Sequence, residues 1–502
     1  MRTNEKVDLA LLLLVSLLLS IYLFSRTYVI SLDGAFQYIP LAKDFASGFY
    51  GKALSHNQQP LYSFIIALLS RWVPDFELAG KLVSSFFGIL MIFPVYFLGK
   101  RIFDERIAFL SSLLLAIHPY IRRFSADVLK ESTYLFFLAT ALWFAWRTIQ
   151  DEKRYPFLFI PLFSALVYLV RPDGVEVLLV LFFYILFIKK FSLPRRKGTV
   201  ILLLLLSSSI LFLPYLVHLK ETTGYWTLSR AKSLEWILGL QVIGYPVPFT
   251  QKILYSFKRL NLEILAIFHP LYVFFFIFGL LKGIWSRLKK GEGFLLSFCA
   301  LHYVVLLLMV LNTTEWGTDK TVQADQLSGR HLLPLLLASI FWAGEGLFTI
   351  YHWIDRKLES HALFSRFGPK RKSIVVMSIL LILVLLIVLP KTLKPRRYEK
   401  LSEKWAGVWI KNQSGKGATI FTNVPRVAYY ADGKCEYIDF NKGKLERVQT
   451  SLGEEGTLYL VLQGREIIGF PEDAESLKEH FVEVKRYGEN RMEKIILYER
   501  VR

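Results

Sequence analysis

Residues 373–390 read SIVVMSILLILVLLIVLP, an apolar stretch without a single charged residue. A helix of about 20 such residues crosses the hydrocarbon core of a bilayer. The whole chain shares this character, because 54% of its 502 residues are hydrophobic and its mean hydropathy is +0.40. Ordinary soluble domains do not combine such values with a net charge of +20. The sequence therefore predicts an all-α polytopic membrane protein.

Apolar stretches of spanning length recur along the chain, and we expect about eleven transmembrane helices. The expected spans are residues 8–26, 78–99, 107–121, 132–148, 156–171, 174–188, 199–217, 263–284, 294–311, 331–350 and 373–390. The first span resembles a signal peptide, but no small-residue cleavage pattern follows it. We interpret it as a retained helix, so that residues 1–390 form one transmembrane domain.

The distribution of Lys and Arg predicts the orientation, because short cytoplasmic loops carry an excess of both. Every second loop is basic. These loops contain Lys100, Arg101 and Arg106; Lys153 and Arg154; Lys189, Lys190, Arg195, Arg196 and Lys197; Lys282, Arg287, Lys289 and Lys290; and Arg356, Lys357, Arg366, Lys370, Arg371 and Lys372. We expect the N-terminus inside and the C-terminus outside. The opposite face then carries residues 27–77, 118–131, 171–173, 218–262 and 312–330.

The polar tail, residues 391–502, differs from the rest of the chain. Its pattern predicts strands at Ala418–Thr422, Thr457–Leu462 and Lys494–Glu499, alternating with helices near 398–411, 425–431 and 473–481. This alternation is typical of a small α/β domain, here extracytoplasmic. The tail contains no recognisable catalytic motif, so acceptor recognition, packing and passive stabilisation all remain open for it.

Composition also limits the partners. Lys and Arg form short clusters between apolar runs, which favours lipid headgroups and indicates no nucleic acid. Cys299 and Cys435 imply no disulfide framework. The histidines lack the spacing of a zinc site. We therefore expect no cofactor and no metal, although a divalent cation held by acidic residues is an alternative.

The loop after the first span is about fifty residues long, and loops of such length are usually functional. It contains Asp33 within Ser31–Tyr38 and later His56-Asn57-Gln58-Gln59-Pro60-Leu61-Tyr62. Aromatic residues interleaved with polar ones suit helices in the membrane interface, which could shape a cleft. The alternative is a connector that lies on the surface.

The next external loop combines basic and acidic residues. It contains Arg122, Arg123, Asp127 and Glu131 directly before the fourth span. If a helix begins at Asp127, the two carboxylates lie at i and i+4 on one face. Ionisable groups near the membrane usually face a cavity, a substrate or another charge. Pairing of Asp127 with Arg122 or Arg123 is the structural alternative, and Arg171-Pro172-Asp173 could equally be an ion pair in a turn.

Together these motifs resemble the GT-C glycosyltransferases. The resemblance rests on Asp33 after the first span, on Gln59-Pro60-Leu61-Tyr62, on the arginine-rich turn with its carboxylates, and on Ser328-Gly329-Arg330-His331-Leu332-Leu333-Pro334. It covers residues 8–350. The chain is similar to the polyprenyl-phosphate-sugar-dependent protein mannosyltransferases and to the lipid A aminoarabinose transferases. It departs from the family pattern at Gln59, at His331, and at Gly34, where many relatives have a second acidic residue.

The resemblance implies transfer of a sugar from a polyprenyl-phosphate donor to a hydroxyl of a lipid, glycan or protein acceptor. A lipid phosphate is already a leaving group, so no nucleotide-binding loop is needed. In an inverting displacement Asp33 would be the base and Glu131 an orienting carboxylate, with Asp127 as the competing assignment. The expected phosphate ligands are Arg330, Arg122, Arg123 and Arg171. Further substrate contacts are expected from Tyr38, His56, Gln59, Tyr62 and His331.

Two other classes of protein share part of the pattern. A transporter or lipid flippase would place its ionisable groups in the middle of the spans, often in two repeated halves. A noncatalytic receptor or scaffold would leave Asp33 and Glu131 unexplained. The external position of the candidate residues favours an enzyme, and the short loops favour the plasma membrane of a prokaryote.

Overall fold

The structure is a computed structural model of the 502-residue chain. It describes residues 3–150, 155–187, 197–230, 238–240, 244–285, 288–358, 369–415, 417–438, 458–469, 480–490 and 492–500. The chain forms two compact units. The first comprises Met1–Phe24 and Leu41–Lys394, and the second comprises Ser25–Pro40 and Pro395–Arg502. The short segment that contains Asp33 therefore belongs to the same unit as the C-terminal residues.

The first unit is helical. Its long helices are α1 (Thr3–Ser25), α5 (Phe76–Leu90), α6 (Ile92–Ile102), α7 (Glu105–Ile117), α9 (Glu131–Gln150), α10 (Tyr155–Val170), α11 (Glu176–Phe187), α12 (Lys197–Thr223), α14 (Phe249–Phe268), α15 (Pro270–Trp285), α16 (Lys290–Thr313), α17 (Leu333–Lys357) and α19 (Pro369–Thr392). Shorter elements are α2 (Ile39–Ala46), α3 (Tyr50–Leu54), α4 (Leu61–Leu69), α8 (Pro119–Ser125), η2 (Pro172–Val175), η3 (Gly329–Leu332) and the hairpin β1 (Glu315–Trp316) and β2 (Val322–Ala324).

Eight of the eleven expected spans fall on one helix each, whereas residues 78–99 fall on α5 and α6, residues 107–121 on α7 and α8, and residues 263–284 on α14 and α15. By length and composition, six described helices can cross a membrane: Glu5–Ser25, Phe76–Ile102, Ile201–Thr223, Lys290–Thr313, Gly329–Lys357 and Arg371–Thr392. The pair α14 and α15 makes a seventh if it counts as one broken span, since the two helices meet at 103° beside His269. The expectation of about eleven spans is therefore supported in part.

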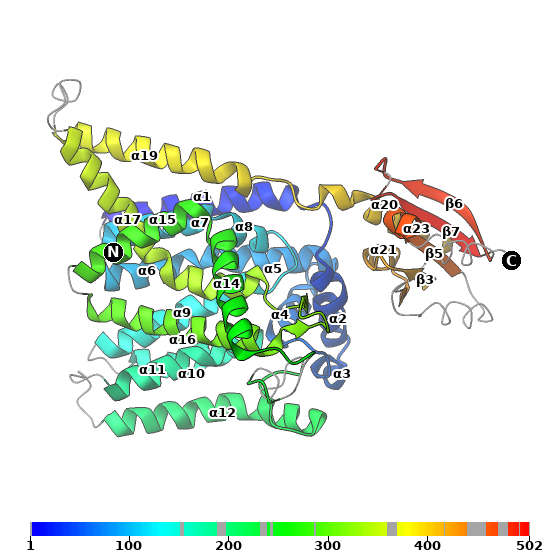
Figure 1. The fold of residues 1–502 in the computed structure, drawn as a ribbon, viewed down its shortest axis with the longest axis horizontal. Helices are drawn as coiled ribbons and strands as arrows, with labels where there is room; N and C mark the ends of the chain where they lie inside the picture. The colour runs from blue at the N-terminus through cyan, green and yellow to red at the C-terminus, as the bar shows by residue number, and fades with distance from the viewer. Residues whose placement is uncertain are drawn as a thin grey trace. The chain divides into compact units, whose positions relative to one another are not determined.

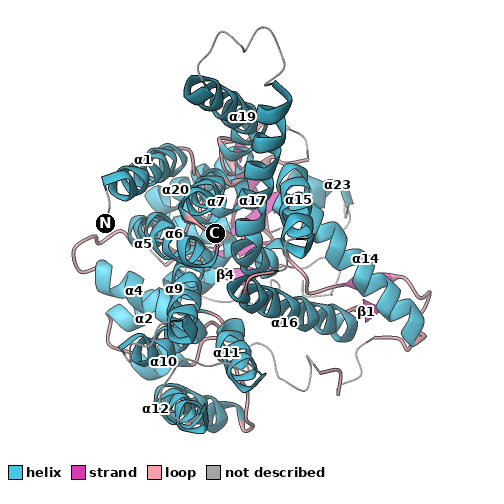
Figure 2. Ribbon diagram, turned by 90° about the vertical axis from the view of Figure 1, so that its left-hand side faces the viewer, coloured by secondary structure: helices cyan, strands magenta, loops and turns pink. Residues whose placement is uncertain are grey.

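Most helices of the first unit run in nearly the same direction, while α14 runs across them (Figure 1). Seen nearly end-on, α17 lies between α7 and α15 (Figure 2). In the most apolar part of the helical stretch Gly329–Lys357, which contains α17, 78% of the residues are buried, compared with 11% in that of Ile201–Thr223 in α12. The apolar surface of α12 thus remains available to lipid, whereas α17 forms the centre of the bundle.

Glycines allow α17 to approach both neighbours closely. A Cβ atom on Gly346 would lie 1.9 Å from the carbonyl oxygen of Phe275 on α15. One on Gly279 of α15 would lie 1.9 Å from the carbonyl oxygen of Trp342. On another face of α17, a Cβ on Gly344 would lie 2.2 Å from Ser111 Oγ of α7. Small residues of this kind bring helix backbones into contact inside membranes.

Substitution of Gly346 tests this crossing. We expect Gly346→Ala to lower stability by about 3 kcal/mol or more, because the methyl group meets backbone that cannot move aside. The temperature of thermal aggregation in detergent measures the effect. Gly51→Ala is the matched control, because nothing lies within 4 Å of its added Cβ and the site is in a short helix. Equal stability of the two variants would contradict the close crossing.

The second unit contains a five-stranded sheet. Its strands are β3 (Thr419–Thr422), β4 (Lys434–Tyr437), β5 (Leu458–Gln463), β6 (Phe481–Tyr487) and β7 (Ile495–Arg500), in the order β4-β3-β5-β7-β6. Strand β3 is parallel to both neighbours, and β7 is antiparallel to both. The helical elements are η1 (Gly34–Tyr38), η5 (Tyr398–Lys400), α20 (Leu401–Ser414), α21 (Arg426–Ala431) and α23 (Gly464–Gly469).

The expected elements of the tail agree in part with this sheet. The three predicted strands overlap β3, β5 and β7, and the first two predicted helices overlap α20 and α21. The helix expected near 473–481 falls mainly outside the described residues, and Phe481 begins β6. The strands β4 and β6 were not predicted, because both are edge strands that carry several charged residues and lack an apolar run.

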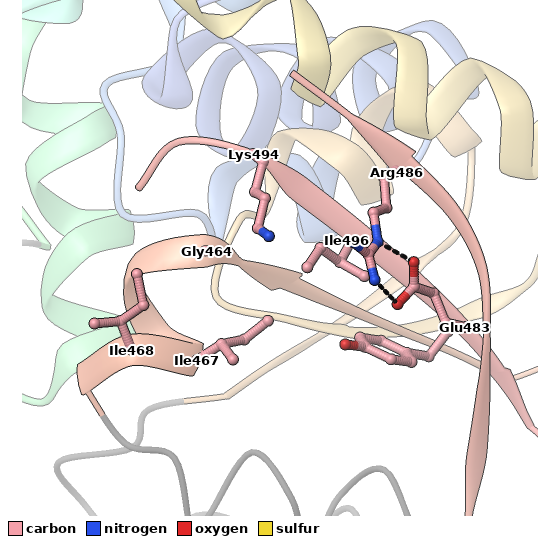
Figure 3. A pocket seen from close by; sticks show the side chains of 8 residues that line it. Gly464, Ile467, Ile468, Glu483, Arg486, Lys494 and Ile496 are labelled. Atoms are coloured by element: carbon pink, nitrogen blue, oxygen red, sulfur yellow. Dashed lines mark hydrogen bonds and ion pairs between the residues drawn. The ribbon is translucent and has the colours of Figure 1, made fainter. Parts of the chain in front are cut away.

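A pocket of about 210 Å³ lies on this sheet (Figure 3). Its polar lining comes from Glu483, Arg486 and Lys494, and Ile467 and Ile496 form part of its apolar lining. Arg486 is paired with Glu483 three residues before it on β6, and one of the two contacts measures 2.7 Å. None of the candidate site residues lines this pocket.

Candidate functional site

The carboxylate of Glu131 is the most unusual group in the first unit. Its side chain is fully buried at the first position of α9. Neither oxygen has a hydrogen-bond partner within the part of the chain that the structure describes. A buried carboxylate without partners is costly, because folding removes its water and returns no bond. A ligand that donates hydrogen bonds would remove this cost.

Helix α9 begins at Glu131, so the expectation of a helix from Asp127 was wrong. Asp127 lies in a tight turn, where its carboxylate accepts a hydrogen bond of 2.8 Å from the amide of Val128. The carbonyl of Leu129 accepts a bond of 2.9 Å from Ser84 on α5. These bonds satisfy the backbone without a helical turn. The two carboxylates therefore do not share a helix face, and the environment of Asp127 favours Glu131 as the substrate-facing group.

Two cations lie beside Glu131. Arg330 Nη1 is 4.0 Å from Glu131 Oε1, beyond hydrogen-bond distance, and its side chain is 36% exposed. Lys130 is half-buried and donates a hydrogen bond of 2.8 Å to Gln58. Burial, together with the positive charges of Arg171 and Arg330, lowers the pKa of Lys130 to about 8. The site thus places Arg330 beside a buried carboxylate and Lys130 within electrostatic range of it.

The backbone that carries Arg330 is fixed from two sides. Its own carbonyl accepts a bond of 2.9 Å from Arg171 Nη1. The next carbonyl, of His331, accepts a bond of 2.9 Å from His302 Nε2. The other ring nitrogen of His302 lies 2.6 Å from Glu176. These bonds fix the backbone from which the Arg330 side chain extends.

Arg171 itself is engaged in structural contacts. It binds both oxygens of Asp173, at 3.1 and 2.8 Å, and lies 4.6 Å from the ring centre of Tyr134. Of the two interpretations left open for this turn, the geometry favours the local ion pair. We therefore assign Arg171 to the support of Arg330, and its expected contact with phosphate stays an untested prediction.

Arg122 and Arg123 occupy different environments. Arg122 is fully buried, and its guanidinium donates to Ser16, Ser20 and the carbonyl of Gly88. It joins α8 to α1 and α5, which favours a structural role over phosphate binding. Arg123 is half-buried, with its guanidinium 5.9 Å from the ring centre of Tyr120. Both arginines are thus engaged by residues other than Glu131.

The residues of the first loop mainly support the fold. Tyr62 is fully buried, and its hydroxyl lies 2.8 Å from Ser84 Oγ. Gln59 donates a bond of 3.1 Å to the carbonyl of Leu228. His56 Nε2 is 2.8 Å from Asp44. Outside this loop, His331 on η3 accepts a hydrogen bond of 3.2 Å at Nδ1 from the amide of Ser328. Their expected substrate contacts remain predictions.

Asp33 and Tyr38 belong to the second unit. Asp33 is half-buried and precedes η1, while Tyr38 at the end of η1 is 1% exposed. Residues before them are bonded to the C-terminal part of the same unit, for example through the 2.9 Å bond from the amide of Ile30 to Tyr430. The assignment of Asp33 as the base stays a prediction.

Sequence reasoning missed two charged residues of the first unit, Lys130 before α9 and Asp44 on α2. Lys130 could have been found, because it directly precedes Glu131 and follows an apolar turn. Asp44 could not, because its partners are distant from it in the loop: it binds Lys52 and His56, each at 2.8 Å. Burial alone would raise the pKa of Asp44, but the hydrogen bonds from these two partners lower it below its usual value.

No group of three or more His, Cys, Asp or Glu side chains suited to a metal ion occurs among the described residues. The expectations that the site works without a metal and without a cofactor remain predictions. Lys130 and Arg330 supply positive charge near Glu131.

Comparison with known proteins identifies the class of this fold. Residues 57–218 match the family model described as dolichyl-phosphate-mannose-protein mannosyltransferase. No curated protein matches the sequence. The fold is shared by crystal structures of glycosyltransferases of the GT-C superfamily, and the resemblance that the sequence motifs indicated is confirmed. The chain is thus a multi-pass membrane protein with the GT-C fold.

The particular structures that it resembles come from bacteria and archaea. Apo ArnT from Cupriavidus metallidurans has a TM-score of 0.63 at 12% identity, with 99% of each chain covered. The same protein bound to undecaprenyl phosphate has a TM-score of 0.61 at 13% identity, covering 100% of this chain and 99% of that one. The Archaeoglobus fulgidus oligosaccharyltransferase AglB, in complex with an inhibitory peptide and a dolichol-phosphate, scores 0.53 at 12% identity, covering 97% and 73%.

Proposed function

We propose that this chain transfers a sugar from a polyprenyl-phosphate donor to a hydroxyl of a lipid, glycan or protein acceptor. The observation that carries the proposal is the buried carboxylate of Glu131, which has no hydrogen-bond partner among the described residues and lies beside Lys130 and Arg330. Sugar hydroxyls donate hydrogen bonds and a phosphate attracts cations. Sugar hydroxyls would therefore supply the hydrogen bonds that Glu131 lacks among the described residues, and the phosphate would be attracted to the positive charges of Lys130 and Arg330.

Each residue has a distinct part in the proposed reaction. The acceptor oxygen attacks the anomeric carbon and gives its proton to Asp33, while the bond from that carbon to the phosphate oxygen breaks. The electron pair leaves with the polyprenyl phosphate, whose charge Arg330 and Lys130 neutralise. Glu131 holds hydroxyls of the sugar or of the acceptor in position. The single displacement inverts the anomeric configuration.

The names of the similar proteins support the choice of donor. The matching family model names dolichyl-phosphate-mannose, and the similar structures contain undecaprenyl phosphate or a dolichol-phosphate. We therefore propose an undecaprenyl- or dolichyl-linked sugar, and mannose is the first sugar to test among other hexoses and pentoses. No nucleotide is required by this chemistry.

Binding of undecaprenyl phosphate tests the proposal directly. We expect Arg330→Ala to weaken this binding about 10- to 100-fold, because a hydrogen bond to a charged group contributes about 1.5–3 kcal/mol. Titration of the purified full chain, followed by native mass spectrometry, measures the affinity. Arg356→Ala, at the exposed end of α17, the helix that follows Arg330, is the matched control. Equal affinities of both variants and the natural chain would refute the assignment of Arg330.

We further propose that the reaction takes place on the extracytoplasmic face, in the plasma membrane of a prokaryote. The support is the placement of Lys and Arg in every second loop, opposite the loops that contain Asp33, Glu131 and Arg330. A cysteine introduced after residue 400 should react with an impermeant thiol reagent added to intact cells. Reaction only after the cells are opened would overturn this orientation.

A further inference from the structure

Three consecutive residues shortly before Asp33 are held through their main chain by the C-terminal residues of the same unit. The segment is Tyr28–Ile30. The carbonyl of Tyr28 accepts a hydrogen bond of 3.3 Å from Lys404 Nζ, and the carbonyl of Val29 accepts one of 2.8 Å from Arg397 Nη1. Ile30 makes two hydrogen bonds: its carbonyl accepts one of 3.0 Å from Arg426 Nε, and its amide donates one of 2.9 Å to the hydroxyl of Tyr430. Main-chain bonds of this number fix the path of the segment, whatever its side chains are.

Arg426 is the best fixed of these donors. Its Nη1 lies 2.8 Å from Glu403 Oε2, and the side chain of Glu403 is 3% exposed. A buried charge is stable only when it is paired and hydrogen-bonded. The planar guanidinium therefore binds Glu403 with one nitrogen and the carbonyl of Ile30 with another, so that a carboxylate on α20 determines where the segment lies.

The anchoring continues to both sides of Asp33. Before it, the carbonyl and the hydroxyl of Ser31 accept bonds of 3.0 Å from the amides of Ala35 and Gly34. After it, η1 packs against α21, the helix that begins at Arg426. Asp33 thus belongs to a short segment whose two ends are both attached to the C-terminal part of the second unit.

We propose that the C-terminal domain positions Asp33 for proton abstraction, with Arg426 as the main positioning residue acting through the carbonyl of Ile30. This inference rests on the proposed function. A general base works only within hydrogen-bond reach of the proton it takes, and a displacement of about 1 Å can reduce a rate about 100-fold. The domain is then a required part of the catalytic unit and more than a passive extension.

The substitution Arg426→Met tests the proposal in the full chain. It removes every donor and retains an unbranched apolar side chain. We expect kcat for release of undecaprenyl phosphate from an undecaprenyl-phosphate sugar to fall about 10- to 100-fold, while the affinity for undecaprenyl phosphate is unchanged. Hydrogen exchange in peptides covering residues 28–36 should rise. Combined with Asp33→Asn, Arg426→Met should cause no further loss, because it acts through the same residue.

Two variants separate positioning from general stability. Arg486→Met removes an arginine from β6 that pairs with Glu483 within three residues of chain, so it should leave both exchange in 28–36 and kcat unchanged. Arg426→Lys retains a charge and one donor, and we expect partial recovery of kcat. If Arg426→Met does not fold, Tyr430→Phe removes only the hydroxyl that binds Ile30 and should shift exchange and kcat in the same direction.

The exchange, rate and double-variant measurements test different parts of the proposal. Unchanged exchange in Arg426→Met overturns the anchoring, and increased exchange with unchanged kcat overturns its role in catalysis. A loss of kcat that is equally large in the Asp33→Asn background shows that Arg426 does not act through Asp33. If the natural chain releases undecaprenyl phosphate from none of the hexose and pentose donors, the proposed function fails, while the exchange comparison still decides the anchoring.

Discussion

The substitution Asp33→Asn should reduce sugar transfer about 10²- to 10⁴-fold, the range of general base catalysis. The amide has nearly the same shape as the carboxylate but cannot accept the proton that the acceptor hydroxyl loses. Binding of undecaprenyl phosphate should be retained, because the proposed phosphate ligands Arg330 and Lys130 are unchanged. Release of undecaprenyl phosphate from its sugar-linked form measures the rate, and titration with undecaprenyl phosphate measures the affinity.

The matched control for this prediction is Asp432→Asn. Asp432 lies in the same unit and has a left-handed backbone with φ of 52°, which asparagine adopts readily. This variant should retain the full rate. An Asp33→Asn enzyme that transfers sugar at the natural rate would eliminate Asp33 as the base, and Asp127 would then be the next carboxylate to test.

Glu131→Gln should reduce transfer about 100-fold. An uncompensated change at a charged hydrogen-bonding group costs about 1.5–3 kcal/mol, which corresponds to about 10- to 150-fold. The variant should also be at least as stable as the natural chain, because it removes a fully buried charge that has no hydrogen-bond partner among the described residues. A group that the fold requires would instead lose both stability and activity. Loss of activity without loss of stability is typical of a residue that serves function and not the fold.

Thermal unfolding and turnover of the same preparation check both parts of this prediction. Glu221→Gln serves as the control, because Glu221 is exposed near the C-terminal end of α12. It should change neither the rate nor the stability by more than about 0.5 kcal/mol. Loss of stability in Glu131→Gln would show that the carboxylate serves the fold.

The sequence was sufficient to predict a mostly helical membrane domain, and it singled out Glu131 and Arg330, which the structure brings together. Apolar runs of spanning length leave few structural choices, because the backbone must satisfy its own hydrogen bonds in lipid. Glu131 and Arg330 each precede or begin a buried helix directly after a loop. Loops on one face bring such helix starts together, and the structure places the two side chains 4.0 Å apart.

Other features depend on contacts that are distant in the sequence. Arg122 and Arg123 are adjacent and of the same type, but only Arg122 is fully buried. Its burial is possible because Ser16 and Ser20 on α1 and the carbonyl of Gly88 on α5 accept hydrogen bonds from its guanidinium. Such partners cannot be identified from a single sequence. The start of α9 was missed for a similar reason, because Ser84 stabilises the preceding turn from another helix.

The glycine contacts of α17 have a consequence for how the chain can move. Carriers that alternate between two faces slide or rock their helices past one another. Helix α17 meets backbone of α15 at Gly346 and a side chain of α7 at Gly344, so it has no layer of flexible side chains to rearrange at these points. Rotation would drive main chain into main chain. Helix α17, which follows Arg330, is therefore fixed against both neighbours at these two points.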